Sequence, residues 1–266
     1  MNILVTGGAG FLGQHLKHYL EATHTVIAPN KFQLNCLDAT SVNNFFDKNA
    51  IDVVIHTALT GRENLFSTDP KFLIDGLDMW RNIYNNRHKF KKLIQFGSAY
   101  ELDLNKNNTL ITANNVLKDL PLPSYGYCKN IMSRMCLQTE NFYNLRLFGN
   151  FHYTEKENRF FKKLLNSSSF TIAENRLFDY VNLDDVLKVA EFVINESPTV
   201  KDINVVYPDK LTLSEQASMF CSLNNINTEI TVANKGFDLT GNSDVLQSFN
   251  LKLDGLEAGF KKYTKG

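Results

Sequence analysis

The chain has 266 residues, of which 43% are hydrophobic, so it can bury the core of one large α/β domain, or of one domain with a smaller lobe. Its 28 basic and 28 acidic side chains balance, which argues against a general nucleic-acid or membrane-surface role. Its four cysteines show no paired spacing, so we expect neither a disulfide framework nor a metal site. Because the first predicted strand starts at residue 2, we expect no signal peptide and a cytoplasmic location.

The first thirteen residues read as a strand, a glycine turn and the start of a helix. Residues 3–5 are aliphatic, Gly7, Gly10 and Gly13 follow, and an apolar helical pattern begins at Phe11. In such a turn the free backbone N–H groups and the positive end of the helix dipole favour a phosphate. The spacing therefore predicts a dinucleotide-binding turn, with an ordinary glycine-rich βα turn as the alternative.

Strands and helices alternate over the first 150 residues, which is typical of right-handed βαβ units in a doubly wound parallel sheet. In chain order, the patterns predict a helix at 11–22, a strand at 25–28, a helix at 40–47, a strand at 52–56, a helix at 70–88, a strand at 92–96, a loop at 101–123, a helix at 125–141 and a strand at 144–148.

Beyond residue 150 the alternation loosens. The patterns there predict a helical piece at 160–165, a strand at 179–183, a helix from Asp184 as N-cap to residue 194, a strand at 203–206, and a capping box at Thr212 and Glu215 that opens a helix to 222. We therefore expect a sheet domain at 1–150 completed by 178–198. Residues 151–177 and 199–266 would form a small interleaved lobe.

Ligands of such sheets bind at the carboxyl ends of the strands, so the residues that follow each strand are the candidates for function. After the second strand, residues 28–32 contain no acidic side chain that could bind a ribose 2′-hydroxyl, whereas Lys31 could pair with a 2′-phosphate. This favours NADP(H) over NAD(H), unless Lys31 is a plain surface lysine. After the third strand, the small residues Thr57 and Ala58 leave room for a cofactor, and His56 is given no role.

Ser98 follows the fourth strand, and Tyr125 and Lys129 lie four residues apart on the next predicted helix, which places them on one face. An ammonium beside a phenol stabilises the phenolate and lowers the pKa of the tyrosine. A serine hydroxyl can bind the same substrate oxygen. Together these groups predict a general acid–base site for a carbonyl/alcohol pair, although a Tyr-x-x-x-Lys spacing alone also arises by chance.

The motifs, taken in order, resemble those of the extended short-chain dehydrogenase/reductases, the family of nucleotide-sugar epimerases, dehydratases and reductases. The matching pieces are Thr6-Gly-Gly-Ala-Gly-Phe-Leu-Gly13, Val53-Val-Ile-His-Thr-Ala58, Gly97-Ser98, Tyr125-x-x-x-Lys129, Leu145-Arg-Leu-Phe-Gly149 and Asp179-Tyr-Val-x-Leu-Asp-Asp185. The segment at 34–46 is most similar to GDP-L-fucose synthases and related 4-keto-sugar reductases.

This resemblance implies a Rossmann domain that binds NAD(P), a catalytic triad of Ser98, Tyr125 and Lys129, a nucleoside-diphosphate sugar as substrate, and a homodimer that binds neither nucleic acid nor membrane. The expected cofactor-binding residues are Gly7, Gly10, Phe11, Leu12, Gly13, Lys31, Cys36, Thr57, Ala58, Leu59, Tyr125, Lys129 and Leu147. The expected substrate-binding residues are Ser98, Tyr100, Tyr125, Arg159 and Arg176. Either arginine could bind the diphosphate bidentately.

Fucose synthases also epimerise their sugar, with a cysteine two residues after the serine and a histidine near the small lobe. Here Tyr100 takes the place of that cysteine, and Asn158-Arg-Phe160 contains no histidine. The favoured prediction is therefore NADPH-dependent reduction of the C4 ketone of a nucleoside-diphosphate 4-keto-6-deoxy sugar, in the synthesis of bacterial-type surface polysaccharide sugars. The alternatives are an NAD-dependent 4-epimerase and a non-catalytic NAD(P)-binding sensor. A 4,6-dehydratase is disfavoured because Ala99-Tyr100 stands where an Asp-Glu pair is needed.

Overall fold

The computed structural model describes residues 1–60 and 65–264 and divides into two compact units. The first unit comprises residues 1–103, 115–146 and 190–203, and the second comprises 104–114, 147–189 and 204–266. This division differs from the predicted one in four segments. Residues 104–114, 147–150 and 178–189 belong to the second unit, and residues 199–203 belong to the first. The last two residues of the predicted lobe, 265 and 266, lie outside the described part.

A six-stranded parallel sheet forms the centre of the first unit, with the strand order β10-β6-β4-β3-β1-β2. Its strands are β1 (Asn2–Thr6), β2 (Thr25–Ile27), β3 (Val53–His56), β4 (Lys92–Ser98), β6 (Phe142–Leu147) and β10 (Asp202–Asn204). Thr6 pairs in register with His56, and His56 pairs with Gln95. The carboxyl ends of β1, β3 and β4 therefore lie along one edge of the sheet, which is where a doubly wound fold binds its ligand.

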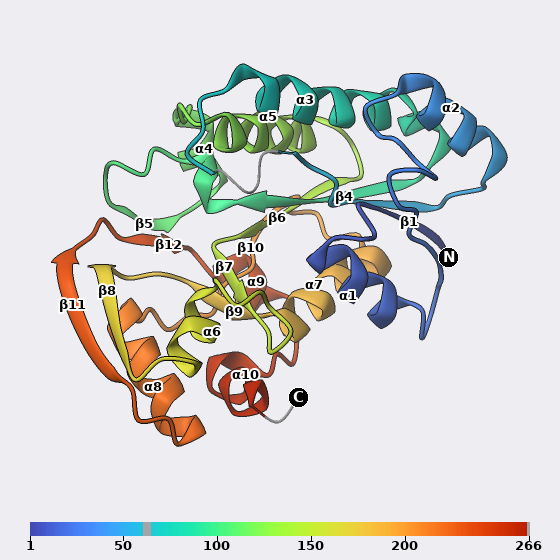
Figure 1. The fold of residues 1–266 in the computed structure, drawn as a ribbon. Coiled ribbons are helices and arrows are strands. Elements are labelled where there is room, and N and C mark those ends of the chain that lie inside the picture. The colour runs from blue at the N-terminus through green and yellow to red at the C-terminus, as the bar shows by residue number, and fades with distance from the viewer. Residues whose placement is uncertain (61–64, 265–266) are drawn as a thin grey trace. The chain divides into compact units, whose positions relative to one another are not determined.

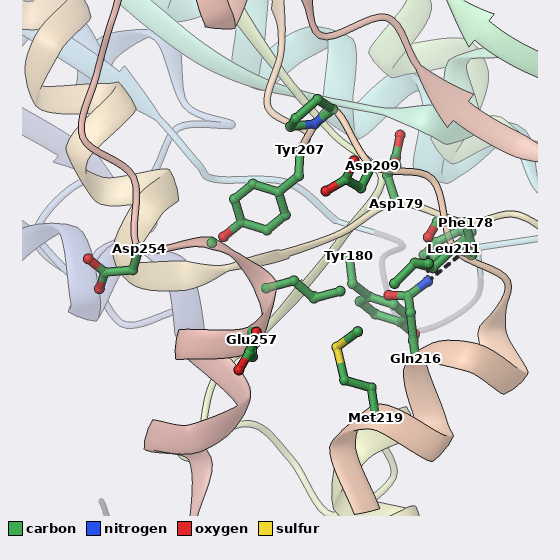
Figure 2. A pocket seen from close by; sticks show the side chains of 13 residues that line it. Phe178, Asp179, Tyr180, Tyr207, Asp209, Leu211, Gln216, Met219, Asp254 and Glu257 are labelled. Carbon is green, nitrogen blue, oxygen red and sulfur yellow. Dashed lines mark hydrogen bonds between the residues drawn. The ribbon is translucent and has the colours of Figure 1, made fainter. Parts of the chain in front are cut away.

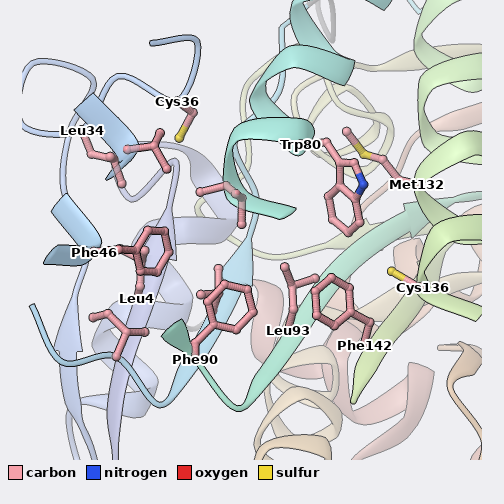
Figure 3. Packing of buried hydrophobic residues seen from close by; sticks show 14 of the residues in the cluster. Leu4, Leu34, Cys36, Phe46, Trp80, Phe90, Leu93, Met132, Cys136 and Phe142 are labelled. Carbon is pink, nitrogen blue, oxygen red and sulfur yellow. The ribbon is translucent and has the colours of Figure 1, made fainter. Parts of the chain in front are cut away.

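Helices cover both faces of this sheet. They are α1 (Phe11–Leu20), α2 (Ala39–Lys48), α3 (Pro70–Asn85) and α5 (Ser124–Gln138), with the short turns η1 (Arg87–Lys89) and η2 (Ala99–Glu101). Figure 1 shows α2, α3 and α5 over one face and α1 on the other. Trp80 of α3, Met132 of α5 and Phe142 of β6 pack in the core beneath α3 and α5, and Phe46 of α2 extends the same cluster (Figure 3).

The second unit is a mixed assembly around an aromatic core. It contains β5 (Asn108–Ile111), β7 (Gly149–Phe151), α6 (Phe160–Leu165), β8 (Ser169–Asn175), β9 (Tyr180–Asn182), α8 (Leu213–Asn224), β11 (Glu229–Lys235), β12 (Leu239–Gly241), α9 (Asp244–Ser248) and α10 (Gly255–Tyr263). The strands pair as β7 with β9, β8 with β11 and β5 with β12. Phe151, Phe161, Phe220 and Phe260 are fully buried and in ring contact with one another.

Two predicted strands belong to the opposite part of the fold. The strand near 203–206, expected in the lobe, is β10 at the edge of the main sheet, where the backbone N–H of Asn144 donates to the carbonyl of Lys201 at 2.7 Å. The strand near 179–183, expected to complete the sheet domain, is β9 and pairs with β7. Both are only 3 residues long, Tyr-Val-Asn in β9 and Asp-Ile-Asn in β10, so their hydrophobic pattern alone does not tell which partner strand each will take.

Two local predictions were also wrong. The expected loop at 101–123 contains β5 and the helix α4 (Ala113–Lys118). Asp184 is not an N-cap, because α7 (Leu183–Glu196) starts one residue earlier and the Asn182 side chain accepts a hydrogen bond from the N–H of Asp184 at 3.3 Å. The capping box of Thr212 and Glu215 at the start of α8 is present as predicted. No helix in the described ranges is both long and apolar enough to cross a bilayer.

Candidate active site

The turn between β1 and α1 is shaped by its glycines. Gly7 has a φ of +69°, and the N–H of Gly10 donates to the Gly7 carbonyl at 2.8 Å, which closes the turn. A Cβ on Gly7 would lie 2.9 Å from the Ala58 nitrogen, and a Cβ on Gly13 would lie 2.4 Å from the Gly7 oxygen. The turn therefore requires glycine at both positions, as a dinucleotide-binding turn does.

The N-terminus of α1 is left open for an anion. Gly10 is the N-cap residue and, in the described chain, no side chain caps this end, while the first turn, which includes Phe11, Leu12 and Gly13, contains no acid. The first N–H groups of a helix lack intrahelical partners, and the dipole adds a partial positive charge there. This bare glycine cradle fits the diphosphate of a dinucleotide.

The end of β3 is held against this turn. The Thr57 hydroxyl donates a hydrogen bond to the Thr6 carbonyl at 2.6 Å, which ties the end of β3 to the end of β1. Ala58 and Leu59 pack against the core cluster. His56 is 1% exposed, and Nδ1 of its ring is 2.9 Å from the Thr6 hydroxyl. Burial, and then the charge of Lys129, lower the pKa of His56 to about 3. His56 is thus a neutral structural residue, and no functional role is assigned to it.

After β2 the chain forms a tight turn. The Asn30 side chain accepts hydrogen bonds from the N–H groups of Phe32 and Gln33 at 2.9 and 3.2 Å. Lys31 is exposed, with its ammonium 5.3 Å from the centre of the Phe32 ring. Cys36 is buried in the core cluster, and burial raises the pKa of its thiol to about 12. Its burial does not favour the predicted contact of Cys36 with the cofactor.

Each of the three predicted catalytic residues lies at the end of β4 or contacts a residue beside it. Ser98 is the last residue of that strand, and its hydroxyl oxygen accepts a hydrogen bond from the N–H of Tyr100 at 3.2 Å. Lys129 is buried on α5, and its ammonium donates to the carbonyl of Phe96, two residues before Ser98, at 2.6 Å. Tyr125, one turn earlier on α5, packs edge-on against the Tyr100 ring at 6.2 Å. Helix α5 is therefore fixed to the strand end on both sides of Ser98.

Close backbone packing sets the approach of α5 to this strand end. A Cβ on Gly126 would lie 2.1 Å from the carbonyl oxygen of Tyr100, so only glycine permits the observed distance. The Ser124 hydroxyl donates to the Asp69 carbonyl at 2.7 Å, which pins the first turn of α5. The glycine directly after Tyr125 is thus needed to bring the phenol beside η2.

Beneath Ser98 lies a fully buried ionic network that the sequence reasoning missed. Glu101 accepts the N–H of Ser98 at 2.8 Å as part of a capping box, and its other oxygen pairs with Arg146 Nε at 3.0 Å. Arg146 also donates to Asp202 at 2.8 Å, and its side chain is completely buried. Burial raises the pKa of Glu101, and the neighbouring Arg146 opposes that rise. The pattern Ser98-x-x-Glu101 is a capping-box signature, which is the signal that could have revealed this acid.

The two arginines predicted to bind substrate lie in the second unit, as does Leu147, the last residue of β6. Arg159 donates to the Asn150 carbonyl at 3.2 Å and lies 3.6 Å from Glu155. The Arg176 guanidinium lies over the Phe178 ring at 5.6 Å, and its Nε is buried without an acceptor among the described residues. A buried N–H donor without a partner is unusual in a folded protein, so Arg176 has the donor capacity that an anionic ligand needs.

The second unit also contains a cavity of about 290 Å³ between β9, α8 and α10. Figure 2 shows Tyr207 and Glu257 on one side and Met219 and Gln216 of α8 on the other. Its wall also includes Asp179, Asp209 and Asp254, whereas neither predicted arginine lines it. Carboxylates repel a diphosphate, so we assign this cavity no phosphate-binding role.

A parallel sheet with a bare glycine turn at its carboxyl edge, followed by a Tyr-x-x-x-Lys helix, defines a Rossmann-type dinucleotide-binding protein. The family model for the NAD dependent epimerase/dehydratase family matches residues 3–205, and the chain therefore belongs to that family. Membership confirms the predicted family.

Known proteins similar to the chain agree with this assignment. A dTDP-D-glucose 4,6-dehydratase of Dictyostelium discoideum is 25% identical over 240 residues, and the match spans 73% of this chain but only 55% of that relative. A GDP-mannoheptose C4 reductase of Campylobacter jejuni, solved with NADP bound, has a TM-score of 0.84 at 19% identity. The match covers 99% of this chain and 97% of that one. A dTDP-4-dehydrorhamnose reductase of Clostridium acetobutylicum has a TM-score of 0.82 at 17% identity, and the match covers 100% of this chain and 99% of that one. At these identities the two solved structures confirm the predicted fold.

Proposed function

We propose that the protein reduces the C4 ketone of a nucleoside-diphosphate 4-keto-6-deoxy sugar with NADPH. The observation that carries this proposal is the anchoring of the Lys129 ammonium on the Phe96 carbonyl at 2.6 Å, beside the strand end that carries Ser98. This bond holds a fixed positive charge on the helix face that also carries Tyr125. Such a charge lowers the pKa of a neighbouring phenol and so equips it to donate a proton.

When bound, NADPH supplies the hydride that adds to C4. Tyr125 donates its phenolic proton to the C4 oxygen as that oxygen gains negative charge, and the product is an alcohol. Lys129 stabilises the phenolate that remains. Ser98 already accepts a hydrogen bond from the N–H of Tyr100, so its hydroxyl proton remains available to hold the ketone oxygen. Lys31 favours the phosphorylated cofactor, because no acid follows β2.

The second unit is proposed to bind the sugar nucleotide. Arg176 supports this role because its buried Nε lacks an acceptor among the residues described, and a diphosphate oxygen would supply one. The likeness to proteins described as a GDP-mannoheptose C4 reductase and a dTDP-4-dehydrorhamnose reductase supports a ketone at C4 as the reacting group.

The direct test is to incubate the purified protein with a panel of nucleoside-diphosphate 4-keto-6-deoxy sugars and either NADPH or NADH, and to identify the products by NMR. Tyr125→Phe should lower kcat by roughly 10²- to 10⁴-fold, because it removes the proton donor, and should weaken NADPH binding far less, because the ring stays in place. Tyr127→Phe, two residues further along the same helix, is the matched control and should keep wild-type turnover. Wild-type turnover in Tyr125→Phe would contradict the mechanism.

The nucleotide that co-purifies with the protein separates reductase from epimerase. A 4-epimerase returns the hydride to its own substrate and retains tightly bound NAD, whereas a reductase exchanges NADPH with solution at each turnover. Extraction of stoichiometric NAD, together with interconversion of C4 epimers without added cofactor, would replace the reductase proposal.

A further inference from the structure

Phe32 is an aromatic side chain held in solvent. Its exposed fraction is 89%, the highest of any large hydrophobic side chain in the described part of the chain. Leaving an aromatic ring in water forgoes the stabilisation that its burial would bring. A ring in this position is therefore a candidate for contact with a ligand.

The turn that carries Phe32 is held in place from both sides. Asn30 Oδ1 accepts hydrogen bonds from the N–H groups of Phe32 and Gln33, and Gln33 Oε1 accepts one from the N–H of Asn30 at 3.0 Å. Just beyond the turn, Leu34 and Cys36 are 4% and 6% exposed and pack in the core cluster, where Figure 3 shows them near Leu4 and Phe46. The ring is thus presented by a fixed turn, so binding need not first order the backbone.

This turn adjoins the dinucleotide cradle. Strand β2 pairs with β1, with Ile27 opposite Leu4. A Cβ on Gly8 would lie 2.6 Å from the Ala28 carbonyl oxygen, so the glycine turn and the end of β2 are in direct backbone contact. In a doubly wound fold the adenosine half of a dinucleotide extends from the glycine turn towards the end of the second strand. Phe32 is therefore displayed beside the path of the adenine.

We propose that Phe32 is a stacking platform for the adenine ring of the cofactor, with the Lys31 ammonium placed for a phosphate on the adjoining ribose. The Lys31 ammonium lies 5.3 Å from the centre of the Phe32 ring, so a base on that ring would bring its ribose near the positive charge. Stacking recognises the base alone and is shared by NAD(H) and NADP(H), whereas Lys31 discriminates between them. Only the Lys31 part rests on the proposed use of NADPH.

The test measures binding of adenosine fragments to nucleotide-free protein by calorimetry, so it does not depend on turnover. The probes are NADPH, 2′,5′-ADP, 5′-AMP and reduced nicotinamide mononucleotide. Phe32→Ala should weaken binding of the first three by roughly 5- to 100-fold, which is the usual effect of removing a base–aromatic stack, and leave the mononucleotide unchanged. Phe32→Trp should restore affinity, and Phe32→Leu should not, because leucine is apolar but cannot stack.

Phe237→Ala removes a phenylalanine that is 49% exposed in the second unit and serves as the control for loss of a surface ring. Lys31→Ala should lower affinity for 2′,5′-ADP and leave 5′-AMP nearly unchanged, which separates the two roles. Wild-type affinity for 5′-AMP in Phe32→Ala would overturn the platform, as would a wild-type protein that binds neither adenosine fragment. Tight NADPH binding without reduction of any keto sugar would reject the proposed reaction and leave the platform intact.

Discussion

Removal of Arg146 is the sharpest test of the buried ionic network. Arg146 is completely buried between Glu101 at 3.0 Å and Asp202 at 2.8 Å, and both acids are shielded from solvent. Arg146→Met keeps much of the side-chain volume but leaves two carboxylates without a cation. Glu101 retains the N–H of Ser98, and Asp202 retains the Asn144 amide at 2.9 Å, so each keeps at least one hydrogen bond.

Breaking a buried pair by removing one partner costs about 3–5 kcal/mol, and here one cation serves two acids. We therefore expect the free energy of unfolding at pH 7 to fall by at least ~3 kcal/mol, a large part of the ~5–15 kcal/mol that stabilises a typical protein. The assay is urea denaturation followed by the fluorescence of Trp80, the only tryptophan, which is 1% exposed and lies in the core of the first unit. Arg81→Met is the matched control, because the exposed Arg81–Asp78 pair at 3.1 Å should contribute under ~1 kcal/mol.

The loss of unfolding free energy caused by Arg146→Met should also depend on pH. Burial already raises the pKa of Glu101, and loss of Arg146 removes the group that opposes this rise. The folded variant then binds a proton at a pH at which unfolded Glu101 remains ionised, so lowering the pH from 7 to 5 stabilises the folded state relative to the unfolded one. The difference between wild type and Arg146→Met should shrink over that interval. A cost below ~1 kcal/mol at pH 7, or a cost that is constant with pH, would refute the electrostatic account.

Three further predictions follow from local geometry. Gly126→Ala places a Cβ 2.1 Å from the carbonyl oxygen of Tyr100 and should lower the free energy of unfolding by roughly 1–3 kcal/mol. Gly10→Ala, whose Cβ would lie 3.1 Å from its nearest atom, should lower it by less, and urea denaturation of both variants tests the difference. The Asp179 carboxyl should titrate near pH 6 by NMR, because burial raises its pKa to about 6, and its contribution to stability should fall as the pH rises from about 4 to 6; a midpoint near 4 would contradict this. Thr212→Ala should cost roughly 0.5–2 kcal/mol through loss of the α8 capping box, and Thr212→Ser should recover most of it in thermal unfolding.

Sequence patterns predicted well the features that depend on neighbouring residues. The glycine turn, the alternation of strands and helices over the first 150 residues and the α8 capping box each follow from local backbone requirements, and each is present in the structure. The placement of Ser98 at the end of β4 and of Tyr125 and Lys129 on one helix belongs to the same class. Their catalytic roles remain predictions until the Tyr125→Phe variant is measured.

Features that depend on distant partners were not predictable in this way. Strands β9 and β10 are both short, and their partners are decided by contacts such as that between Asn144 and Lys201, 57 positions along the chain. The Arg146 network is equally distant in sequence, because its two acids lie 45 positions before and 56 positions after it. A single sequence shows each of these residues alone, so only the folded chain reveals that they meet.

The wide spacing of the Arg146 network has a consequence for folding during synthesis. When a nascent chain has emerged as far as β6, Arg146 has Glu101 available but not Asp202, and the main sheet still lacks its edge strand β10. Residues 147–189, which belong to the second unit, must emerge before Asp202 does. Contacts between residues so far apart form slowly, because the intervening loop must be closed before they contribute stability. Until then the nascent first unit keeps an open sheet edge, and Arg146 is paired with only one of its two acids, so this stage of folding is exposed to aggregation.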